Sequence, residues 1–208
     1  MIAVVDYGAG NITSVVKALE AVGAAVRVVS RPDQAEGADA LVIPGVGHFA
    51  ATGPLHERWQ RPIRKAIDSE MPVLGICLGM QWLFEGSDEA PGASGLGIFQ
   101  GRCFRLPDAV KVPHVGWNTV DAGDAASTLL ADLRDGASAY FAHSFAAPSG
   151  PCTLATTTHG ARFAAAVARG SVYGVQFHPE KSGRTGLKLL ANFVAITREK
   201  RSPCSPAA

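Results

Sequence analysis

The residue best suited to covalent chemistry in this sequence is Cys77, which stands between two glycines in the run GICLG, residues 75–79. The apolar residues 73–76 predict a buried strand, and residues 78–85 predict a helix that begins directly after the cysteine. The two glycines remove side chains from the tight turn that joins the two elements. A glycine-x-nucleophile-x-glycine pattern at such a turn is typical of a nucleophile elbow.

The place of Cys77 at the start of a helix would favour its thiolate form, because a helix N-terminus carries partial positive charge. The N–H of Leu78, the next residue, would point to where an oxyanion forms during acyl transfer. The same pattern also fits a small cysteine that is buried in a glycine-flanked turn. A base elsewhere in the chain is needed to decide between these two interpretations.

A candidate base lies near the C-terminus, in the run QFHPE, residues 176–180. The apolar residues 172–177 predict a strand, and residues two apart in an extended segment face the same side. His178 and Glu180 should then project together, with Pro179 holding the segment extended. Glu180 can accept the N–H of one ring nitrogen of His178, which leaves the other nitrogen to accept a thiol proton. The sequence therefore predicts a Cys-His-Glu triad.

The elements that must position this triad alternate between strand and helix over the first 85 residues. Strands are expected at residues 2–5, 25–29, 40–43 and 73–76, and helices at 11–22, 31–36 (short, or a turn), 55–69 and 78–85. Such alternation predicts an α/β fold with a parallel sheet. Strand-like segments follow at 99–106, 111–120, 139–146, 152–158, 163–169 and 171–177, before a last helix at 186–197. Their mixed spacing predicts a partly antiparallel region beside the parallel sheet.

Length and composition indicate one globular domain. The chain has 208 residues, of which 47% are hydrophobic and 18% charged, with a formal net charge of +1. The length suffices to bury a core, and the charge gives no reason to expect nucleic acid or a membrane surface as a partner. No apolar run is long enough to cross a bilayer and no secretion signal is evident, so we expect a cytoplasmic protein. We expect a single domain over residues 1–198 and a disordered tail at 199–208.

The spacing of the cysteines bears on disulfides and metal sites. The four cysteines lack the spacing of metal ligands, so neither a disulfide framework nor a metal site is expected.

The runs GICLGMQ (75–81) and QFHPEK (176–181) together resemble the class I, or triad, glutamine amidotransferases. Four further runs narrow the resemblance to the glutaminase subunits of imidazole glycerol phosphate synthases: DYGAGN (6–11), PGVGHF (44–49), KVPHVGWN (111–118) and YFAHSF (140–145). The resemblance covers nearly the whole chain.

The resemblance implies a fold and an activity. The fold is flavodoxin-like, with a mixed, mainly parallel central sheet flanked by helices and an added antiparallel region. The activity is glutamine hydrolysis through a thioester on Cys77, with no cofactor and no metal. The implied partner is a (β/α)8-barrel cyclase subunit, which would form a heterodimer with this chain. It would use the ammonia to make imidazole glycerol phosphate and AICAR in histidine biosynthesis.

The resemblance also implies roles for residues outside the triad. The oxyanion hole would be completed, after a rearrangement, by a segment opposite the N–H of Leu78, formed by Gly45, Val46 and Gly47. Glutamine itself would contact Gln81 and the backbone of His143, Ser144 and Phe145, where the family more often has tyrosine at position 145. The residues that match partner-facing positions are Asn11, Trp117, Asn118 and Lys181. His114, in contrast, is expected to be a structural histidine.

Three alternative functions remain open from the sequence. The chain could be a glutaminase that serves another synthase, such as one making pyridoxal phosphate, anthranilate or GMP, although DYGAGN and PHVGWN argue against this. It could be a catalytically silent binding module on the same fold, against which the complete triad argues. It could also be a cysteine peptidase or other hydrolase with a similar elbow, which would fail to release glutamate from glutamine.

Overall fold

The centre of the fold is a seven-stranded sheet, seen in a computed structural model that describes residues 1–122, 127–133 and 136–199. In spatial order its strands are β10 (Thr153–His159), β11 (Ala161–Arg169), β12 (Val172–Val175), β4 (Val73–Ile76), β3 (Ala40–Ile43), β1 (Ile2–Val5) and β2 (Val26–Val29). The strands from β12 to β2 pair in parallel, whereas β10 and β11 join them as antiparallel neighbours. The mixed, mainly parallel sheet expected from the sequence is therefore confirmed.

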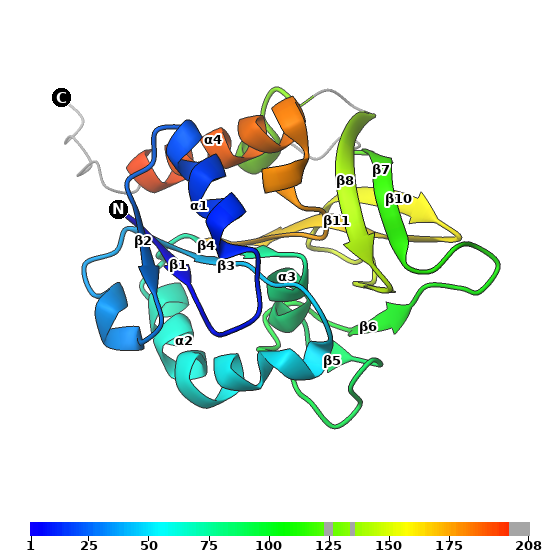
Figure 1. Cartoon of the computed structure of the whole chain (residues 1–208), viewed down its shortest axis with the longest axis horizontal. Coiled ribbons are helices and arrows are strands. Elements are labelled where there is room, and N and C mark those ends of the chain that lie inside the picture. The colour runs from blue at the N-terminus through cyan, green and yellow to red at the C-terminus, as the bar shows by residue number, and fades with distance from the viewer. Residues whose placement is uncertain (123–126, 134–135, 200–208) are drawn as a thin grey trace.

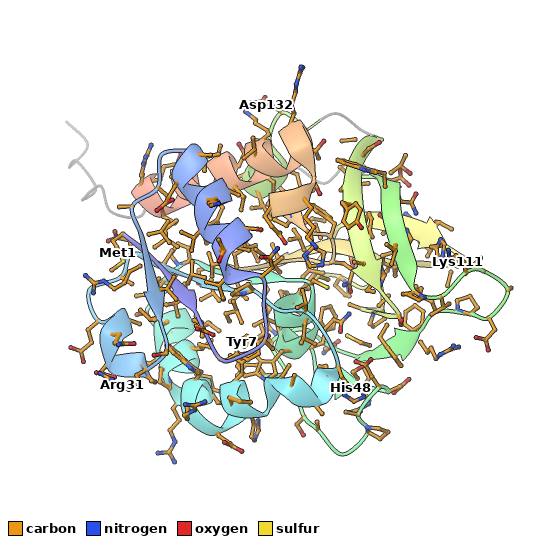
Figure 2. All side chains as sticks on the ribbon, in the orientation of Figure 1. Met1, Tyr7, Arg31, His48, Lys111 and Asp132 are labelled. Atoms are coloured by element: carbon orange, nitrogen blue, oxygen red, sulfur yellow. The ribbon has the colours of Figure 1, made fainter. Side chains whose placement is uncertain are left out.

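Helices cover both faces of this sheet (Figure 1). On one face lie α1 (Ile12–Ala21) and α4 (Gly183–Glu199), and on the other lies α2 (Gln60–Asp68). Successive residues of the parallel strands pack into the two different cores, Val4 with the first layer of helices and Val5 with the second. Because both faces are covered, these strands read as continuous apolar runs rather than as alternating ones. Figure 2 shows the side chains that fill the two layers, with Tyr7 in the interior and Arg31 and Lys111 on the outside.

The antiparallel region lies at one end of the sheet (Figure 1). It contains the antiparallel pair β7 (His114–Val120) and β8 (Ala137–His143). A small sheet lies beside it, in which β6 (Arg102–Arg105) pairs in parallel with β5 (Gly86–Ser87) and antiparallel with β9 (Phe145–Ala146). The single strand expected at 139–146 is thus two strands, which break at Ser144 and pair with different neighbours. This break matters for function, because it lies beside the candidate site described below.

Most predicted elements of the parallel half are confirmed within one or two residues, and some predictions need correction. The helix expected at 55–69 begins as a π-helical turn, η3 (Leu55–Trp59), before α2 continues it. The helix after the cysteine is α3 (Leu78–Leu83), which ends early because Phe84 is extended. The last strand ends at Val175 rather than at residue 177. Short 3-10 turns complete the fold: η1 (Pro32–Ala35), η2 (Phe49–Thr52), η4 (Thr128–Leu130) and η5 (Pro179–Lys181).

Two expectations concern membranes and the C-terminal tail. None of the helices in residues 1–122, 127–133 and 136–199 has the length and apolar character that crossing a membrane requires. Glu199 is the last residue of α4, and residues 200–208 of the expected tail lie outside the described residues.

Candidate active site

Cys77 lies at the junction of β4 and α3 in a backbone conformation that is unusual for a residue with a side chain. Its φ is 52° and its ψ is −106°, and only 5% of the residue is exposed. A non-glycine residue at such a positive φ costs on the order of 1–3 kcal/mol and persists only where its surroundings enforce it. Here the N–H of Cys77 donates to the carbonyl of Val175 at 2.8 Å, and α3 packs on the sheet directly behind the turn.

The two glycines beside Cys77 are required by close backbone contacts. A Cβ on Gly79 would lie 1.9 Å from the carbonyl oxygen of Ile43, and a Cβ on Gly75 would lie 2.7 Å from the backbone nitrogen of Met80. Contacts below 3.0 Å do not occur for real Cβ atoms. These glycines therefore let α3 approach the ends of β3 and β4, as the elbow pattern predicts.

His178 and Glu180 form a buried pair at the start of α4. The Nδ1 of His178 lies 2.9 Å from Oε1 of Glu180, and the two side chains are only 2% and 1% exposed. The predicted reason for this pairing is wrong, however. The segment is not extended, because Pro179 begins the 3-10 turn η5. Proline suits the first position of a helical turn, and the turn brings Glu180 back toward His178.

The position of His178 is fixed by its own backbone. Its N–H donates to the carbonyl of Tyr140 at 2.9 Å, and its carbonyl accepts from the hydroxyl of Ser182 at 2.6 Å. Because Nδ1 donates to Glu180, Nε2 is the nitrogen left to exchange a proton, and it makes no hydrogen bond within the described part of the chain. The neighbouring side chain of Cys77 interacts with this imidazole and raises its pKa.

The charge state of His178 reflects its two neighbours. Burial by itself lowers the pKa of His178, but the interactions of the imidazole with the side chains of Cys77 and Glu180 more than offset this and raise the pKa to about 10. The imidazole therefore carries a proton at neutral pH. A protonated histidine beside a cysteine is the pair that acyl transfer through a thiolate needs.

The predicted oxyanion hole is occupied by the protein's own backbone. The N–H of Leu78 donates to the carbonyl of Gly45 at 3.4 Å. Since the N–H of a trans peptide points away from its carbonyl, the N–H of Val46 points away from Leu78. Gly45 is closely packed, because a Cβ there would lie 2.4 Å from the hydroxyl of Tyr7 and 2.7 Å from Cβ of Leu78. The two expected donors do not converge in this structure.

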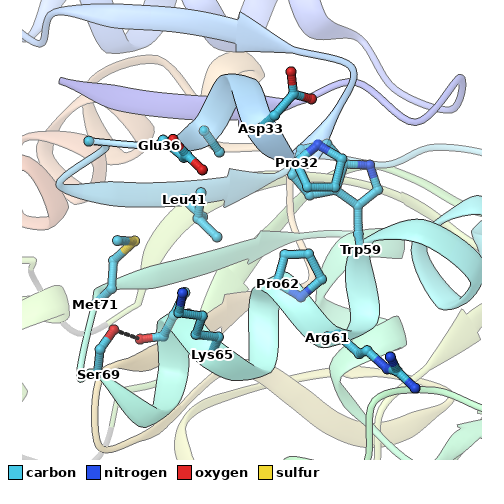
Figure 3. Close-up of a pocket in the computed structure, with 13 residues that line it drawn as sticks. Pro32, Asp33, Glu36, Leu41, Trp59, Arg61, Pro62, Lys65, Ser69 and Met71 are labelled. Atoms are coloured by element: carbon cyan, nitrogen blue, oxygen red, sulfur yellow. Dashed lines mark hydrogen bonds between the residues drawn. The ribbon is translucent and has the colours of Figure 1, made fainter.

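A small cavity brings the predicted substrate residues together in front of Cys77. Its lining comprises Gly47, Cys77, Leu78, Gln81, Glu89, Ala142, His143, Ser144 and Phe145. Its volume is about 30 Å³. A cavity of this size holds about two water molecules, so glutamine does not fit without some opening. A larger cavity of about 690 Å³ lies between η1 and α2, beside Trp59 and Pro62 (Figure 3), and none of the triad residues lines it.

Gln81 is buried, and its amide nitrogen donates two hydrogen bonds within the protein. Its Nε2 donates to the carbonyl of Phe145 at 2.7 Å and to Oε1 of Gln176 at 3.1 Å. The Nε2 of Gln176 in turn donates to Sγ of Cys77 at 3.6 Å. Gln176 was missed from the sequence, although it stands two residues before His178 in the run QFHPE. Its place beside the predicted base in that run is the signal that could have found it.

Two further residues near Cys77 were not predicted. The side chain of Glu89 lines the cavity, and its Oε2 accepts from the N–H of Phe49 at 2.7 Å. The hydroxyl of Tyr7 is buried without a hydrogen-bond partner among the described residues, and burial, followed by the charge of Cys77, raises the pKa of Tyr7. Tyr7 belongs to the run DYGAGN, but nothing in that run predicts this position, and Glu89 belongs to none of the runs named above. Both residues come from loops that reach the site only in the folded chain.

The predicted partner-facing residues do not all share one surface. Trp117 is 59% exposed on the outer face of β7, beside Tyr140 at 6.1 Å between ring centroids. Lys181 lies over the same Tyr140 ring at 5.7 Å. Asn118 is on the opposite face of β7, where its amide donates to the carbonyl of Thr158 at 3.0 Å. Asn11 is the N-cap residue of α1, and its side chain makes no capping hydrogen bond.

No metal-binding cluster occurs in the part of the chain that the structure describes, where groups of three or more histidine, cysteine, aspartate or glutamate side chains were sought. The histidines near the cavity use their ring nitrogens for hydrogen bonds within the protein. His114, for which a structural role was expected, is one of these.

Comparisons with known proteins agree with this geometry. The family model described as glutamine amidotransferase class-I matches residues 3–196. The imidazole glycerol phosphate synthase subunit HisH of Thermococcus kodakarensis is 48% identical, over 93% of this chain and 98% of that protein. The corresponding subunit of Deinococcus radiodurans is 47% identical, over 90% of each chain. Among solved structures, PurLQS of Thermotoga maritima has a TM-score of 0.74 at 20% identity, covering 94% of this chain and 97% of that one.

Proposed function

Because the chain belongs to the class-I glutamine amidotransferase family, we propose that it hydrolyses glutamine as the glutaminase subunit of an imidazole glycerol phosphate synthase. The observation that supports this most is the buried His178–Glu180 pair at 2.9 Å, which faces Cys77 at a strained elbow. The assignment to imidazole glycerol phosphate synthase is supported by the relatives, which are HisH subunits of that synthase. The ammonia released would serve histidine biosynthesis.

The residues present suffice for a two-stage reaction. In the first stage the thiolate of Cys77 attacks the side-chain carbonyl carbon of glutamine and forms a tetrahedral oxyanion. The imidazolium of His178 gives its Nε2 proton to the departing nitrogen, which leaves as ammonia, and a thioester remains. In the second stage a water attacks the thioester while Nε2 takes its proton. The carbon–sulfur bond then breaks, which releases glutamate and restores the thiolate–imidazolium pair.

The rate of glutamine hydrolysis would be controlled through stabilisation of the oxyanion. The N–H of Leu78 is one donor, but here it is paired with the carbonyl of Gly45. Rotation of the Gly45–Val46 peptide would free this N–H and turn the N–H of Val46 inward as a second donor. Each such donor contributes about 3 kcal/mol to the transition state. We therefore expect the isolated chain to hydrolyse glutamine slowly.

Substrate recognition would use the cavity in front of Cys77. Its lining includes one carboxylate, that of Glu89, which suits the α-ammonium group of an amino acid. The backbone of residues 143–145, at the break between β8 and β9, would hold the α-carboxylate. Gln81 would act at the same cavity, and its amide nitrogen could donate to the substrate only by giving up one of its present hydrogen bonds.

The partner we propose is the (β/α)8-barrel cyclase subunit of the synthase. Its docking surface would include Trp117 and Lys181, and Asn11 at the start of the neighbouring helix α1. An exposed tryptophan on a strand face is typical of an interface residue. The alternative synthases are not favoured, because the relatives at 48%, 46% and 47% identity are HisH subunits.

The test is glutamate release from glutamine by the purified chain, alone and with the cyclase subunit and its nucleotide ligand. We expect strong stimulation in the complex. Cys77→Ala and His178→Ala should abolish glutamine-dependent synthesis and leave ammonia-dependent synthesis by the complex intact. Full activity of the isolated chain would point to a stand-alone glutaminase, and no activity in either state would contradict the proposal.

A further inference from the structure

A chain of hydrogen bonds leads inward from β7 to the break between β8 and β9. Nδ2 of Asn118 lies 3.2 Å from Nε2 of His114, whose Nδ1 lies 3.0 Å from Nε2 of His143. Nδ1 of His143 lies 2.9 Å from the carbonyl oxygen of Phe145. Both histidines are buried, and the ring of His159 stacks on His114 with 4.1 Å between centroids.

The direction of these hydrogen bonds is determined by chemistry. A carbonyl oxygen only accepts, so Nδ1 of His143 carries the proton. Its Nε2 then accepts from Nδ1–H of His114, and Nε2 of His114 accepts from the amide N–H of Asn118. Burial lowers the pKa of His114 to about 4 and that of His143 to about 3, so both rings are neutral at physiological pH. Only one pair of tautomers satisfies all three contacts.

The same carbonyl continues the chain to the nucleophile. The oxygen of Phe145 also accepts from Nε2 of Gln81 at 2.7 Å, and that Nε2 reaches Oε1 of Gln176 at 3.1 Å. Nε2 of Gln176 donates to Sγ of Cys77 at 3.6 Å. A continuous polar path thus joins Asn118, on the strand that carries the exposed Trp117, to the reactive sulfur.

We propose that Asn118, His114 and His143 are positioning residues, which hold the carbonyl of Phe145 and the amide of Gln81 in place for glutamine hydrolysis. The inference rests on the proposed function for the reaction that it serves. None of the three needs to touch the reacting atoms for this role. A buried polar chain of this kind is rigid when every member is satisfied and costly when one member is lost.

A second consequence follows from the position of Asn118 in the sheet. It follows Trp117 in β7, with its side chain on the opposite face of the strand. Any displacement of the outer face of β7 therefore moves Asn118, which is the first donor of the hydrogen-bonded path. The polar path therefore links the proposed docking surface to the glutamine site. Its other end is the cavity lining, since Gln81, His143 and Phe145 all contribute to it.

The sharpest test is Asn118→Asp, which preserves shape and replaces the amide nitrogen that faces His114 and the carbonyl of Thr158 with an oxygen that only accepts. A carboxylate only accepts, so Nε2 of His114 must carry a proton. The neutral ring would then present Nδ1 without a proton to Nε2 of His143, which is also without one. An imidazolium at position 114 would restore the contacts on both sides of His114 because both of its nitrogens donate, whereas the hydrogen bond to Thr158 would stay lost. The groups that face these rings are His159 and, toward His143, His178.

We expect kcat of the complex with Asn118→Asp to fall about tenfold at about pH 8 and to recover partly toward about pH 6, as His114 gains a proton. Asn118→Leu should lose activity without any recovery at lower pH. The matched control is Thr119→Ala, an exposed position on the other face of β7, which should follow the wild-type profile. The partner is kept in excess so that docking does not limit the rates.

A second readout separates this inference from the proposed function. Nitrogen-15 chemical shifts of the imidazole rings report tautomers directly, and alkylation of Cys77 by iodoacetamide reports the environment of its sulfur. We expect Asn118→Asp to change the His114 tautomer or charge and the alkylation rate, even if the wild-type complex released no glutamate. Wild-type ring shifts in Asn118→Asp, or kcat and KM within about twofold of wild type at every pH, would overturn the inference.

Discussion

At the scale of single residues, the site depends on a strained cysteine and on a histidine whose charge is set by its neighbours. Cys77 is kept at a φ of 52° by the sheet and by α3. His178 is kept protonated by Cys77 and Glu180, against the effect of its own burial. Both features cost free energy, and the packing of the rest of the fold offsets this cost. Strained residues and buried charges at reactive centres persist for this reason.

The charge of His178 predicts how stability depends on pH. Its pKa is raised from 6.5 to about 10, so its contribution to the free energy of unfolding is fully present below about pH 6.5. That contribution is lost as the pH rises through about 10. Glu180→Gln removes one cause of the raised pKa. We expect this variant to be less stable than wild type near neutral pH, with the difference narrowing toward alkaline pH. Urea unfolding at several pH values measures this, and a constant difference would contradict it.

The hydroxyl of Tyr7 gives a second prediction at this scale. It is buried and has no hydrogen-bond partner in the described residues. An unsatisfied buried polar group costs on the order of 1–3 kcal/mol, so Tyr7→Phe should leave the free energy of unfolding unchanged or raise it by about 1 kcal/mol. Urea unfolding tests this. A loss of stability would mean that the hydroxyl has a partner in solution.

At the scale of elements, the site is an arrangement of backbones that only glycine allows. Helix α3 lies against the end of β3 through Gly79, and α4 lies against η5 through Gly186, where a Cβ would meet the carbonyl of Pro179 at 1.8 Å. The first contact positions Cys77 and the second positions the turn that carries Glu180. The precision of the triad therefore comes from close packing of short elements, which tolerates no added volume.

Gly79→Ala tests this packing. Its Cβ would lie 1.9 Å from the carbonyl oxygen of Ile43, so α3 must move away from the sheet. Overpacking of this kind costs about 1–3 kcal/mol or more, and we expect a loss of about 3 kcal/mol in the free energy of unfolding together with loss of glutaminase activity.

Gly53→Ala is the matched control for that substitution. Gly53 has a φ of −46°, which alanine adopts easily, and a Cβ there meets no atom within 4 Å. Its stability should be unchanged or raised by up to about 1 kcal/mol, because alanine restricts the unfolded chain. Equal losses in both variants would show that glycine itself, and not the contact with Ile43, is what matters.

At the scale of the whole molecule, the reactive centre lies between the parallel half of the sheet and the antiparallel region (Figure 1). Cys77 comes from the parallel half, whereas the cavity is closed by the end of β8 and by Phe145. β7 forms the outer side of this region and carries the exposed Trp117. This arrangement puts the proposed docking surface next to the closed cavity, which fits an enzyme that its partner opens.

Trp117→Ala tests the docking surface. We expect the affinity for the cyclase subunit to fall by about 2 kcal/mol or more, since tryptophan is the residue type most often found at interface hot spots. The stability of the isolated chain should change little, because the side chain is 59% exposed. Val28→Ala, on the edge strand β2 at the other end of the sheet and 45% exposed, is the control and should bind as wild type. Titration calorimetry gives both affinities, and equal affinities of the two variants would contradict this surface.

The sequence by itself determined the features that depend on local spacing. Continuous apolar runs fixed β1, β3 and β4 at their observed residues, and the glycines around Cys77 predicted the elbow. These features are readable because side-chain periodicity and turn chemistry act over a few neighbouring residues. The pairing of His178 with Glu180 was also predicted, although an extended segment was assumed where η5 forms.

Only the tertiary structure decided which partner each polar group takes. The carbonyl of Gly45 faces Leu78, the amide of Asn118 faces His114 rather than the outside, and Gln176 reaches Cys77. Each of these contacts joins segments far apart in the chain, and local spacing specifies the face of an element but not what packs against that face. A buried polar group must find a partner, and the packed fold alone decides which donors and acceptors are within reach.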